Sequence, residues 1–392
     1  MKLLSVAVFV GSIVIGVRSR VNYDGYRVFR VSTHHDADAI QDQIKTFTTI
    51  PFNLDVSEHV DVAVAPKDVA AFEALNLDTE ILHEDLGADI IDESASTFST
   101  DDFSVAALPD LAWFNSYHPY ADHVQFFTSL QANFPNNSEL VTAGTSYQGR
   151  SIFGIHLWGS GGKGSKPAIY FHGTVHAREW ITAMVVEYIT YQLIDGYSKD
   201  AAVKALVDKF DFYILPFVNP DDVNRNWPYR WDVPGGASTN PCSETYKGAA
   251  AGDTPESKGL VAFTQQLAAD QGIKLYIDWH SYGQYILLPY GYNCSARATN
   301  HARQLTLATN TASTIAQRYG TRFTYGPSCS TLYATTGDSV DYLTDVSKAE
   351  FAWTIELRPT GSSGGGFVLP PAQILPSALE QWDGIKYLLA QV

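Results

Sequence analysis

The sequence predicts two folded parts, a small α+β domain at the front and a larger α/β domain whose central sheet is mixed, mostly parallel and flanked by helices. Two observations predict this division. Between residues 26 and 91 short strand-like stretches alternate with helical ones, whereas after Leu108 apolar runs alternate with longer amphipathic segments. Continuous apolar runs are typical of parallel strands that are buried on both faces. At 392 residues the chain is long enough for two or three folding units.

A secretory signal peptide is predicted over residues 1–19. Lys2 precedes an apolar run from Leu3 to Val17, and a small residue, Ser19, follows the run. This order is typical of a signal peptide, whereas a single membrane anchor would need a longer unbroken apolar span. We therefore expect a secreted, extracellular protein with no membrane partner.

The predicted front domain and its linker cover residues 20–107. Strands are expected at 26–31 and 60–64, and helices at 37–47 and 66–75. The stretch 92–102 is rich in Ser, Thr and acidic residues and has no periodicity, so it reads as an exposed linker that is open to proteolysis.

The predicted large domain covers residues 108–392. Its strand-like apolar runs are 166–172, 210–219, 275–280 and 351–356, and its clearest helices are 181–194 and a last one from 376. A chain that alternates in this way forms an α/β sheet domain.

Charge and cysteine content narrow the function. The net charge is −16, and residues 20–108 hold 18 Asp and Glu against 5 Lys and Arg. No basic footprint for nucleic acid is present, so no nucleic-acid partner is expected. The three cysteines of a secreted chain leave one without a partner.

Polar residues capable of chemistry follow three of the apolar runs. His176 and Glu179 follow one run, and His280 and Glu356 end two others. Ligands bind at the carboxyl ends of strands in open α/β sheets, and two histidines with one carboxylate suit a zinc ion that keeps a fourth position open. The alternatives are a turn histidine near a solvated Glu179, a core histidine at 280, and a Glu356 that pairs with Arg358.

Six motifs in order strengthen the zinc interpretation: HAREW, VNRNW, NPCSETYKG, DWHSYGQYILLPYGY, LYATTGDSVDY and TIELR. Together they resemble the zinc metallocarboxypeptidases of the carboxypeptidase A type, in their secreted fungal form with a pro-domain. The resemblance covers nearly the whole chain. It implies the zinc carboxypeptidase fold over 108–392, a ferredoxin-like inhibitory pro-domain over 20–107, and a monomeric metalloprotease that is made as a zymogen.

The resemblance also implies the catalytic roles. His176, Glu179 and His280 would hold one zinc ion per chain, and Glu356 would activate the water bound there and pass its proton to the leaving amine. The substrates would be the C-termini of peptides and proteins. An activating protease would cut the linker, and because residues 92–108 contain no Lys or Arg, that protease is not expected to be trypsin-like.

Substrate recognition follows from the same resemblance. Asn224, Arg225 and Tyr333 would bind the free carboxylate of the last residue, and Arg178 would contact the substrate further along. A terminal carboxylate needs directional, charge-assisted donors of this kind. Val340 matches the base of the side-chain pocket, and an uncharged residue there predicts apolar or aromatic C-terminal residues rather than basic ones.

One departure from the family pattern lies between FYILPFVNP and VNRNW, where residues 219–221 run almost directly into residues 222–225. Family members carry an additional segment there, with an arginine that stabilises the oxyanion; losing such a donor costs about 10²- to 10³-fold in rate. The same segment contains the partner of Cys242, whereas Cys294 and Cys329 match a second disulfide. Three explanations stay open: the sequence comes from an incompletely read gene whose natural form contains the segment, the protein is a genuine but weakened enzyme, or it is a relative that binds zinc and peptide C-termini without turnover.

Overall fold

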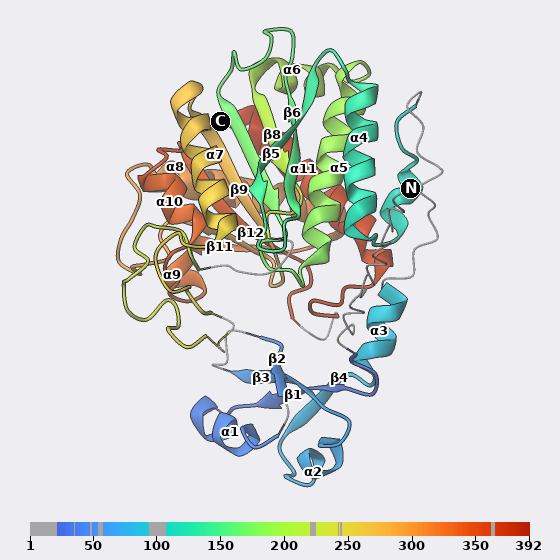
Figure 1. Cartoon of the computed structure of the whole chain (residues 1–392), viewed down its shortest axis with the longest axis vertical. Coiled ribbons are helices and arrows are strands. Elements are labelled where there is room, and N and C mark those ends of the chain that lie inside the picture. The colour runs from blue at the N-terminus through green and yellow to red at the C-terminus, as the bar shows by residue number, and fades with distance from the viewer. Residues whose placement is uncertain are drawn as a thin grey trace, which may run out of the picture.

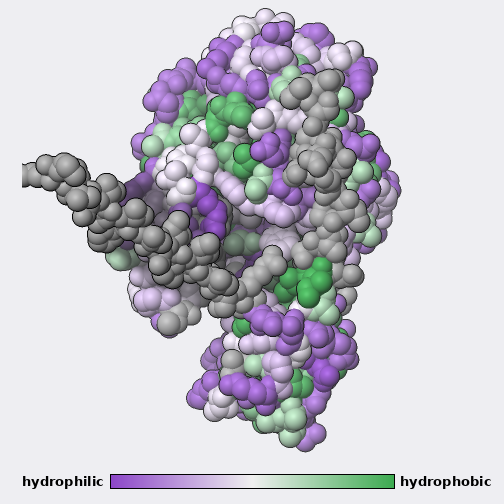
Figure 2. Space-filling model, turned by 45° about the vertical axis from the view of Figure 1, so that its right-hand side comes forward, coloured by the Kyte–Doolittle hydropathy of each residue, from purple (hydrophilic) through white to green (hydrophobic). Residues whose placement is uncertain are grey.

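The computed structural model describes residues 22–34, 36–47, 49–53, 58–93, 107–219, 225–241, 243, 245–361 and 365–392. They form two lobes, a small front domain (residues 22–93) and a large domain (residues 107–392), which lie one below the other in Figure 1. The space-filling view shows apolar surface close to the boundary between the lobes (Figure 2). The predicted signal peptide, Asn224 and Cys242 lie outside the described residues.

The front domain is an antiparallel sheet with the strand order β2-β3-β1-β4. Its core includes Phe29, Val31, Val62 and Phe72, and alternate residues of the strands face it. The elements are β1 (Arg27–Ser32), α1 (Ala37–Ile44), β2 (Thr49–Pro51), β3 (His59–Val64), α2 (Val69–Glu73), β4 (Thr79–His83) and α3 (Leu86–Glu93).

The large domain is built on a sheet that has eight strands among the described residues, in the order β11-β10-β12-β9-β7-β8-β6-β5. The four central strands, β12, β9, β7 and β8, are parallel. The strands β5, β6 and β10 pair antiparallel with their inner neighbours, and β11 pairs parallel with β10. Their bounds are β5 (Ser138–Thr145), β6 (Ser151–Leu157), β7 (Ala168–Gly173), β8 (Asp211–Leu215), β9 (Ile273–Ser281), β10 (Tyr285–Leu288), β11 (Thr324–Pro327) and β12 (Phe351–Leu357).

Helices cover both faces of this sheet, as Figure 1 shows. One face packs against α4 (Tyr120–Asn133), α5 (Trp180–Tyr197), α6 (Ala201–Lys209), α8 (His301–Tyr319) and α11 (Ile374–Gln391). The other face packs against α7 (Pro255–Asp270) and α10 (Ser339–Asp345), and α9 (Ser328–Thr331) is a single turn after β11. The described residues also contain two 3₁₀ helices, Leu111–Asn115 and Pro371–Gln373.

Alternation along the central strands assigns each side chain to one face. In β9, Leu275, Ile277 and Trp279 belong to the core beneath α5, whereas Tyr276 belongs to the core beneath α7 and α10. In β12, Trp353 belongs to the core beneath α5, and Ala352 belongs to the core beneath α7 and α10. Because side chains alternate with a period of two, His280 and Glu356 lie on the same face, that of Tyr276 and Ala352.

These two cores contain only residues of the large domain, so this domain is expected to fold without the front domain. The predicted α/β class and mostly parallel centre are confirmed. The sequence did not reveal β5, β6, β10 and β11, and α3 extends to Glu93, two residues into the predicted linker. No helix among the described residues combines the length and apolar character that a bilayer crossing requires.

Candidate metal centre and active site

A short loop of residues 174–179, the metal loop, carries His176 and Glu179 between the end of β7 and the start of α5. Thr174 has a φ of 55°, a left-handed conformation in which the chain turns sharply. The Thr182 hydroxyl oxygen accepts a hydrogen bond from the Thr174 N–H and donates one to the Glu179 carbonyl, both at 2.8 Å. The first turn of α5 therefore holds both ends of the loop.

His280 and Glu356 come from the central parallel strands. Each is the penultimate residue of its strand, β9 or β12, and the register pairs the two residues directly. Since both strands end at the same edge as β7, the metal loop and these two side chains meet there.

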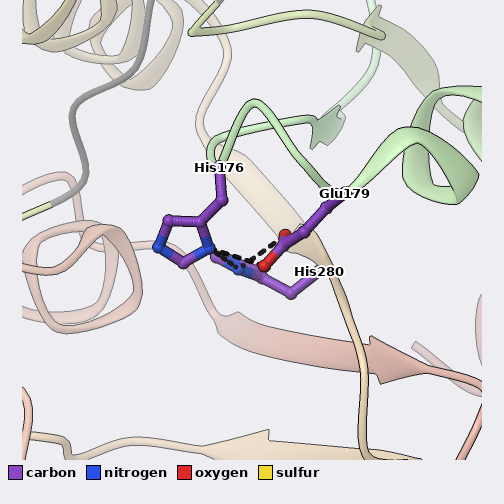
Figure 3. A group of neighbouring side chains, drawn as sticks. All are labelled: His176, Glu179 and His280. Atoms are coloured by element: carbon purple, nitrogen blue, oxygen red, sulfur yellow. Dashed lines mark hydrogen bonds and ion pairs between the residues drawn. The ribbon is translucent and has the colours of Figure 1, made fainter. Parts of the chain in front are cut away.

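The three predicted ligands converge on one point (Figure 3). His176 Nδ1 lies 2.7 Å from Glu179 Oε1 and 3.2 Å from His280 Nδ1, and His280 Nδ1 lies 3.3 Å from Glu179 Oε2. These separations are close to the ~3.3 Å between neighbouring ligand atoms around a tetrahedral zinc ion with bonds of about 2.0–2.1 Å. The side chains therefore suit one zinc ion.

The chemistry of the donor set supports the same fit. The two Nδ1 atoms face each other, and at most one of them can carry a proton between them, whereas a cation takes a lone pair from both. Glu179 is 3% exposed, and its Oε2 atom accepts no hydrogen bond among the described residues. Burial acts to raise the pKa of its carboxyl, but His176 and His280 bring that pKa to about 2. Glu179 is thus a carboxylate, the form that binds a cation.

Asp278 supports His280 from behind. Its Oδ1 atom lies 3.0 Å from His280 Nε2 and 2.8 Å from His172 Nε2, and the Ser339 hydroxyl donates to Oδ2. Burial acts to raise the pKa of the Asp278 carboxyl, but the charges of His172 and His280 hold it well below its usual range. A carboxylate this close to the far nitrogen favours a proton on Nε2 of His280 and would leave Nδ1 for a metal ion.

Glu356 lies beside the ligands without belonging to them. Burial raises the pKa of its carboxyl to about 8, and the charge of His280 acts in the opposite direction. The alternative pairing with Arg358 does not occur. The Arg358 guanidinium bonds instead to Glu380, with Nε 3.0 Å from Oε1, and to Gln373 and Thr321.

Arg358→Ala is expected to lower the free energy of unfolding by about 3 kcal/mol, because it leaves the fully buried Glu380 carboxylate without its cation. The measurement is chemical unfolding of the full chain. Arg318→Ala, which removes a partly exposed pair with Asp383, is the control and should cost below about 1 kcal/mol. Equal losses in the two variants would contradict a special role for the buried pair.

A pocket beside the predicted metal ligands, the recognition pocket, is lined by three of the residues that were predicted to bind substrate. Arg225, Tyr333 and Val340 line it together with His176, His280 and Glu356. Arg225 is 5% exposed, and its charge acts on both Tyr333 and Glu356. The structure thus brings Arg225, Tyr333 and Val340 together in one pocket. Arg178 lines a second, neighbouring cavity, which His176 and Glu356 also line.

A further residue, Asp338, lines this pocket and was not predicted from the sequence as a site residue. Its carboxylate accepts hydrogen bonds from the Asp341 N–H at 2.9 Å and from the Thr335 hydroxyl at 2.8 Å, and the first of these bonds caps α10. Burial raises the pKa of this carboxyl. The signal was present in the sequence, since Asp338 stands two residues before Val340 in the same motif.

The front domain lies over this site. A cavity of about 510 Å³ is lined by Arg30, Asn53 and His59 of the front domain and by His176 and Glu356 of the large domain. Phe367 links the two sides: its ring lies 6.0 Å from that of Phe52 and 4.0 Å from the Arg178 guanidinium. The Tyr282 hydroxyl donates to the Phe52 carbonyl at 3.4 Å.

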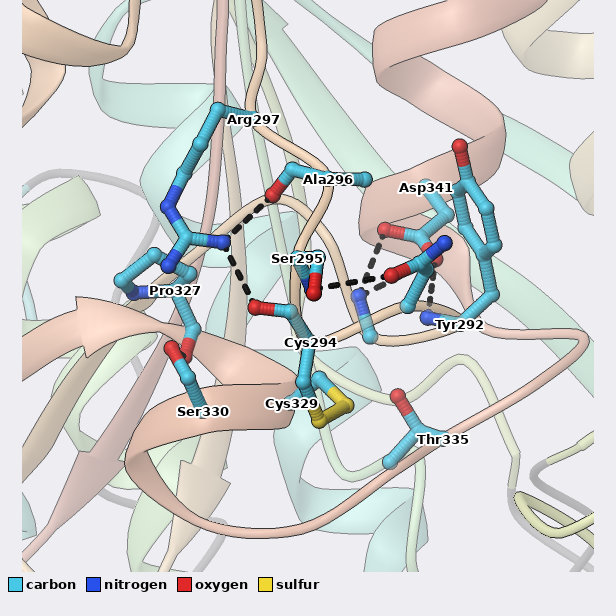
Figure 4. The surroundings of a disulfide bond; sticks show 12 residues. Tyr292, Cys294, Ser295, Ala296, Arg297, Pro327, Cys329, Ser330, Thr335 and Asp341 are labelled. Carbon is cyan, nitrogen blue, oxygen red and sulfur yellow. Dashed lines mark hydrogen bonds between the residues drawn. A yellow bond between two sulfur atoms is a disulfide. The ribbon is translucent and has the colours of Figure 1, made fainter.

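A disulfide joins Cys294 and Cys329, the pair that the family resemblance matched (Figure 4). It ties the loop after β10 to α9, and the Cys329 N–H donates to the Tyr290 carbonyl at 3.0 Å. The neighbouring Ser328 lines the recognition pocket. The disulfide therefore holds one wall of the pocket in place.

Comparison with protein families identifies the origin of this arrangement. The zinc carboxypeptidase family matches residues 123–221 and 222–384. The chain belongs to the zinc carboxypeptidase family. The match comes in two pieces that meet between Asp221 and Asp222, the position where the sequence pattern departs from the family. Zinc is the metal that the family description names, and His176, Glu179 and His280 form a group that could hold it.

Relatives of zinc carboxypeptidase type extend over the whole chain. The chain is 43% identical to a metallocarboxypeptidase A-like protein of Trichophyton verrucosum, and the alignment covers 100% of this chain and 99% of the relative. It is 41% identical to metallocarboxypeptidase A of Trichophyton rubrum, and that alignment covers 99% of this chain and 98% of the relative. Thrombin activatable fibrinolysis inhibitor has a similar fold, with a TM-score of 0.84 and 23% identity over 94% of this chain and 99% of that chain. The predicted family is confirmed.

Proposed function

We propose that this protein is a secreted zinc-dependent metallocarboxypeptidase that is made as a zymogen and releases apolar or aromatic C-terminal residues. The observation that carries the proposal is the placement of Glu356 beside His280, within a pocket that also contains Arg225, Tyr333 and Val340. The family and the names of the relatives support the reaction class.

The residues divide the work as follows. Arg225 and Tyr333 bind the terminal carboxylate, so that only the last peptide bond reaches the metal site, and Asn224 adds an amide donor. Val340 accepts an apolar side chain. Glu356 takes a proton from the attacking water and delivers it to the leaving amine. Zinc, when held by His176, Glu179 and His280, polarises the scissile carbonyl and lowers the pKa of water.

The test is hydrolysis of blocked dipeptides that end in Phe or in Arg, with and without a zinc chelator, by the protein after removal of the front domain. Chelator-sensitive release of Phe in preference to Arg is the expected result. Asp338→Asn keeps the helix cap and removes a carboxylate that lines the same pocket as Val340, so it shows whether any release of Arg depends on that charge. Release of Arg in preference to Phe would contradict the assignment of Val340.

A second candidate is a catalytically impaired or inactive relative that binds zinc and peptide C-termini. The broken family match between Asp221 and Asp222 favours it, because the oxyanion arginine that the resemblance places in the absent segment has no counterpart in this chain. The retained Glu356 favours the enzyme, since binding needs no general base. Tight binding of a Phe-ending peptide without release of Phe, by zinc-loaded protein, would decide for this candidate.

Latency is the remaining part of the proposal. The cavity shared by the front domain and the metal ligands supports a front domain that blocks the substrate until the linker is cut. Because residues 92–108 contain no Lys or Arg, trypsin is expected to leave the linker intact, which mass spectrometry of the digest measures. A protease that cuts after apolar residues is the positive control, and a clean tryptic cut between Ser94 and Leu108 would contradict the prediction.

A further inference from the structure

Two sequences of the form Asn-x-Ser, residues 136–138 and 293–295, are acceptor sequons for N-linked glycosylation in a secreted protein, and the proposed chemistry uses neither. We propose that Asn136 carries an N-linked glycan that shields the edge strand β5. The inference rests on the secretion that is part of the proposed function, because this modification occurs on secreted chains. It does not depend on zinc or on peptide hydrolysis.

The modification transfers an oligosaccharide from a lipid diphosphate donor to the side-chain amide of Asn136. The amide nitrogen, Nδ2, forms a bond to the anomeric carbon of the first sugar, and the bond from that carbon to the diphosphate oxygen breaks. The nitrogen gives up one proton, and the lipid diphosphate leaves with the electron pair. The product is a bulky, hydrophilic group, so the asparagine that carries it must face solvent in the folded protein.

Asn136 meets this requirement in the structure. It lies in the turn of residues 134–137 that joins α4 to β5, and it is exposed. The Asn137 N–H donates to the Phe134 carbonyl at 3.1 Å and closes the turn. The side chain of Asn136 makes no hydrogen bond to the part of the chain that the structure describes. A glycan on its nitrogen therefore displaces no hydrogen bond of the fold.

The other two residues of this sequon anchor the turn. The Asn137 amide donates to the carbonyls of residues 158–159, at 3.0 and 3.2 Å. The Ser138 hydroxyl donates to the Phe134 carbonyl at 2.6 Å, and Ser138 is 4% exposed. These bonds hold the chain that follows Asn136 against the large domain and leave the acceptor side chain in solvent.

The turn lies far from the predicted metal ligands. Ser138 pairs with Leu157 at the end of β6, and Leu157 pairs with Phe212 near the start of β8. The turn is therefore at the edge where the parallel strands begin, whereas His280 is at the edge where they end, beneath the front domain. A glycan on Asn136 is expected to obstruct neither the substrate nor the front domain.

The first half of β5 is the surface that such a glycan would cover. β5 is an outer strand of the sheet, and Leu140 is 48% exposed. The second half is covered by α7, which comes so close that a side chain at Gly259 would collide with the Ala143 carbonyl. Exposed edge strands tend to pair with other chains. A hydrophilic group two residues before β5 would oppose such pairing at Leu140.

The second sequon is a weaker candidate. The Asn293 Oδ1 atom accepts a hydrogen bond from the Ser295 N–H at 2.8 Å, and Cys294 between them is bonded to Cys329. Gly291, two residues before Asn293, lines the recognition pocket. A glycan at Asn293 would stand beside the wall of that pocket, so the structure favours Asn136.

The experiment maps the glycans of the full chain after secretion from a fungal host. Peptide N-glycosidase converts a glycosylated asparagine to aspartate and, in water labelled with heavy oxygen, marks it for mass spectrometry. We expect the label at Asn136, and an unlabelled Asn136 in secreted protein would overturn the proposal. If residues 1–19 do not direct secretion, the proposed secretion fails, and the same map of the chain behind an established signal peptide decides on Asn136.

Two neighbouring variants separate the glycan from the turn. Asn136→Gln removes the acceptor without breaking a hydrogen bond, so the mass released by the glycosidase at this sequon should be lost completely. Asn137→Gln is the matched control, because it keeps the sequon and its glycan but removes the amide that donates to residues 158–159. Asn136→Gln should self-associate more than Asn137→Gln and the unaltered protein in light scattering, with zinc content unchanged. Equal scattering of Asn136→Gln and the unaltered protein would overturn the shielding of β5.

Discussion

Glu356→Gln is expected to lower kcat for a Phe-ending blocked dipeptide by about 10²- to 10⁴-fold, the range that a positioned general base contributes. Glutamine keeps the size of the side chain and its place beside His280 in the register of β9 and β12. It cannot take a proton from water or return one to an amine. The measurement is kcat of the protein without its front domain, with zinc content determined on the same sample.

Zinc content separates this result from a structural failure. Glu356 is not one of the three grouped ligands, so zinc binding should be unchanged in Glu356→Gln. Glu350→Gln is the matched control: Glu350 stands directly before the same strand, 41% exposed and paired with Lys274 and Arg303, and its loss should leave kcat unchanged. An active Glu356→Gln protein would remove Glu356 from the proposed chemistry.

The candidate site was largely predictable because its residues follow strong local patterns. His280 and Glu356 end apolar runs that only buried central strands explain, and strands that are parallel in such a sheet end at one edge. Their direct pairing was not predictable, since a shift of one residue in register would have turned one side chain to the opposite face. The structure supplies that register.

Other features depend on contacts between distant segments. The partner of Arg358 is Glu380, on a helix that the sequence predicted but could not place against β12. The outer strands β5, β10 and β11 are short or partly exposed, so their apolar pattern is weak. The contact of His172 with Asp278, the carboxylate beside His280, joins β7 to β9, and no spacing in the sequence reveals it.

His280→Ala is expected to weaken zinc binding on the order of 10³-fold and to abolish hydrolysis. A zinc site contributes about 10–16 kcal/mol in total, so one of four ligand positions accounts for roughly 3–4 kcal/mol. The measurement is competition for zinc with a chelator of known affinity. His301→Ala, at the start of α8 and outside the site, is the control. Unchanged zinc affinity in His280→Ala would exclude His280 as a ligand.

Asp278→Asn should give an intermediate result, which distinguishes support of a ligand from ligation itself. The amide can still contact His280 Nε2 but no longer carries the charge that Asp278 presents to both His280 and His172. Loss of such a partner weakens metal binding by about 10- to 100-fold. Because His280 remains, excess zinc should restore hydrolysis in Asp278→Asn and not in His280→Ala. If excess zinc restored both or neither, the separate roles of these two residues would be wrong.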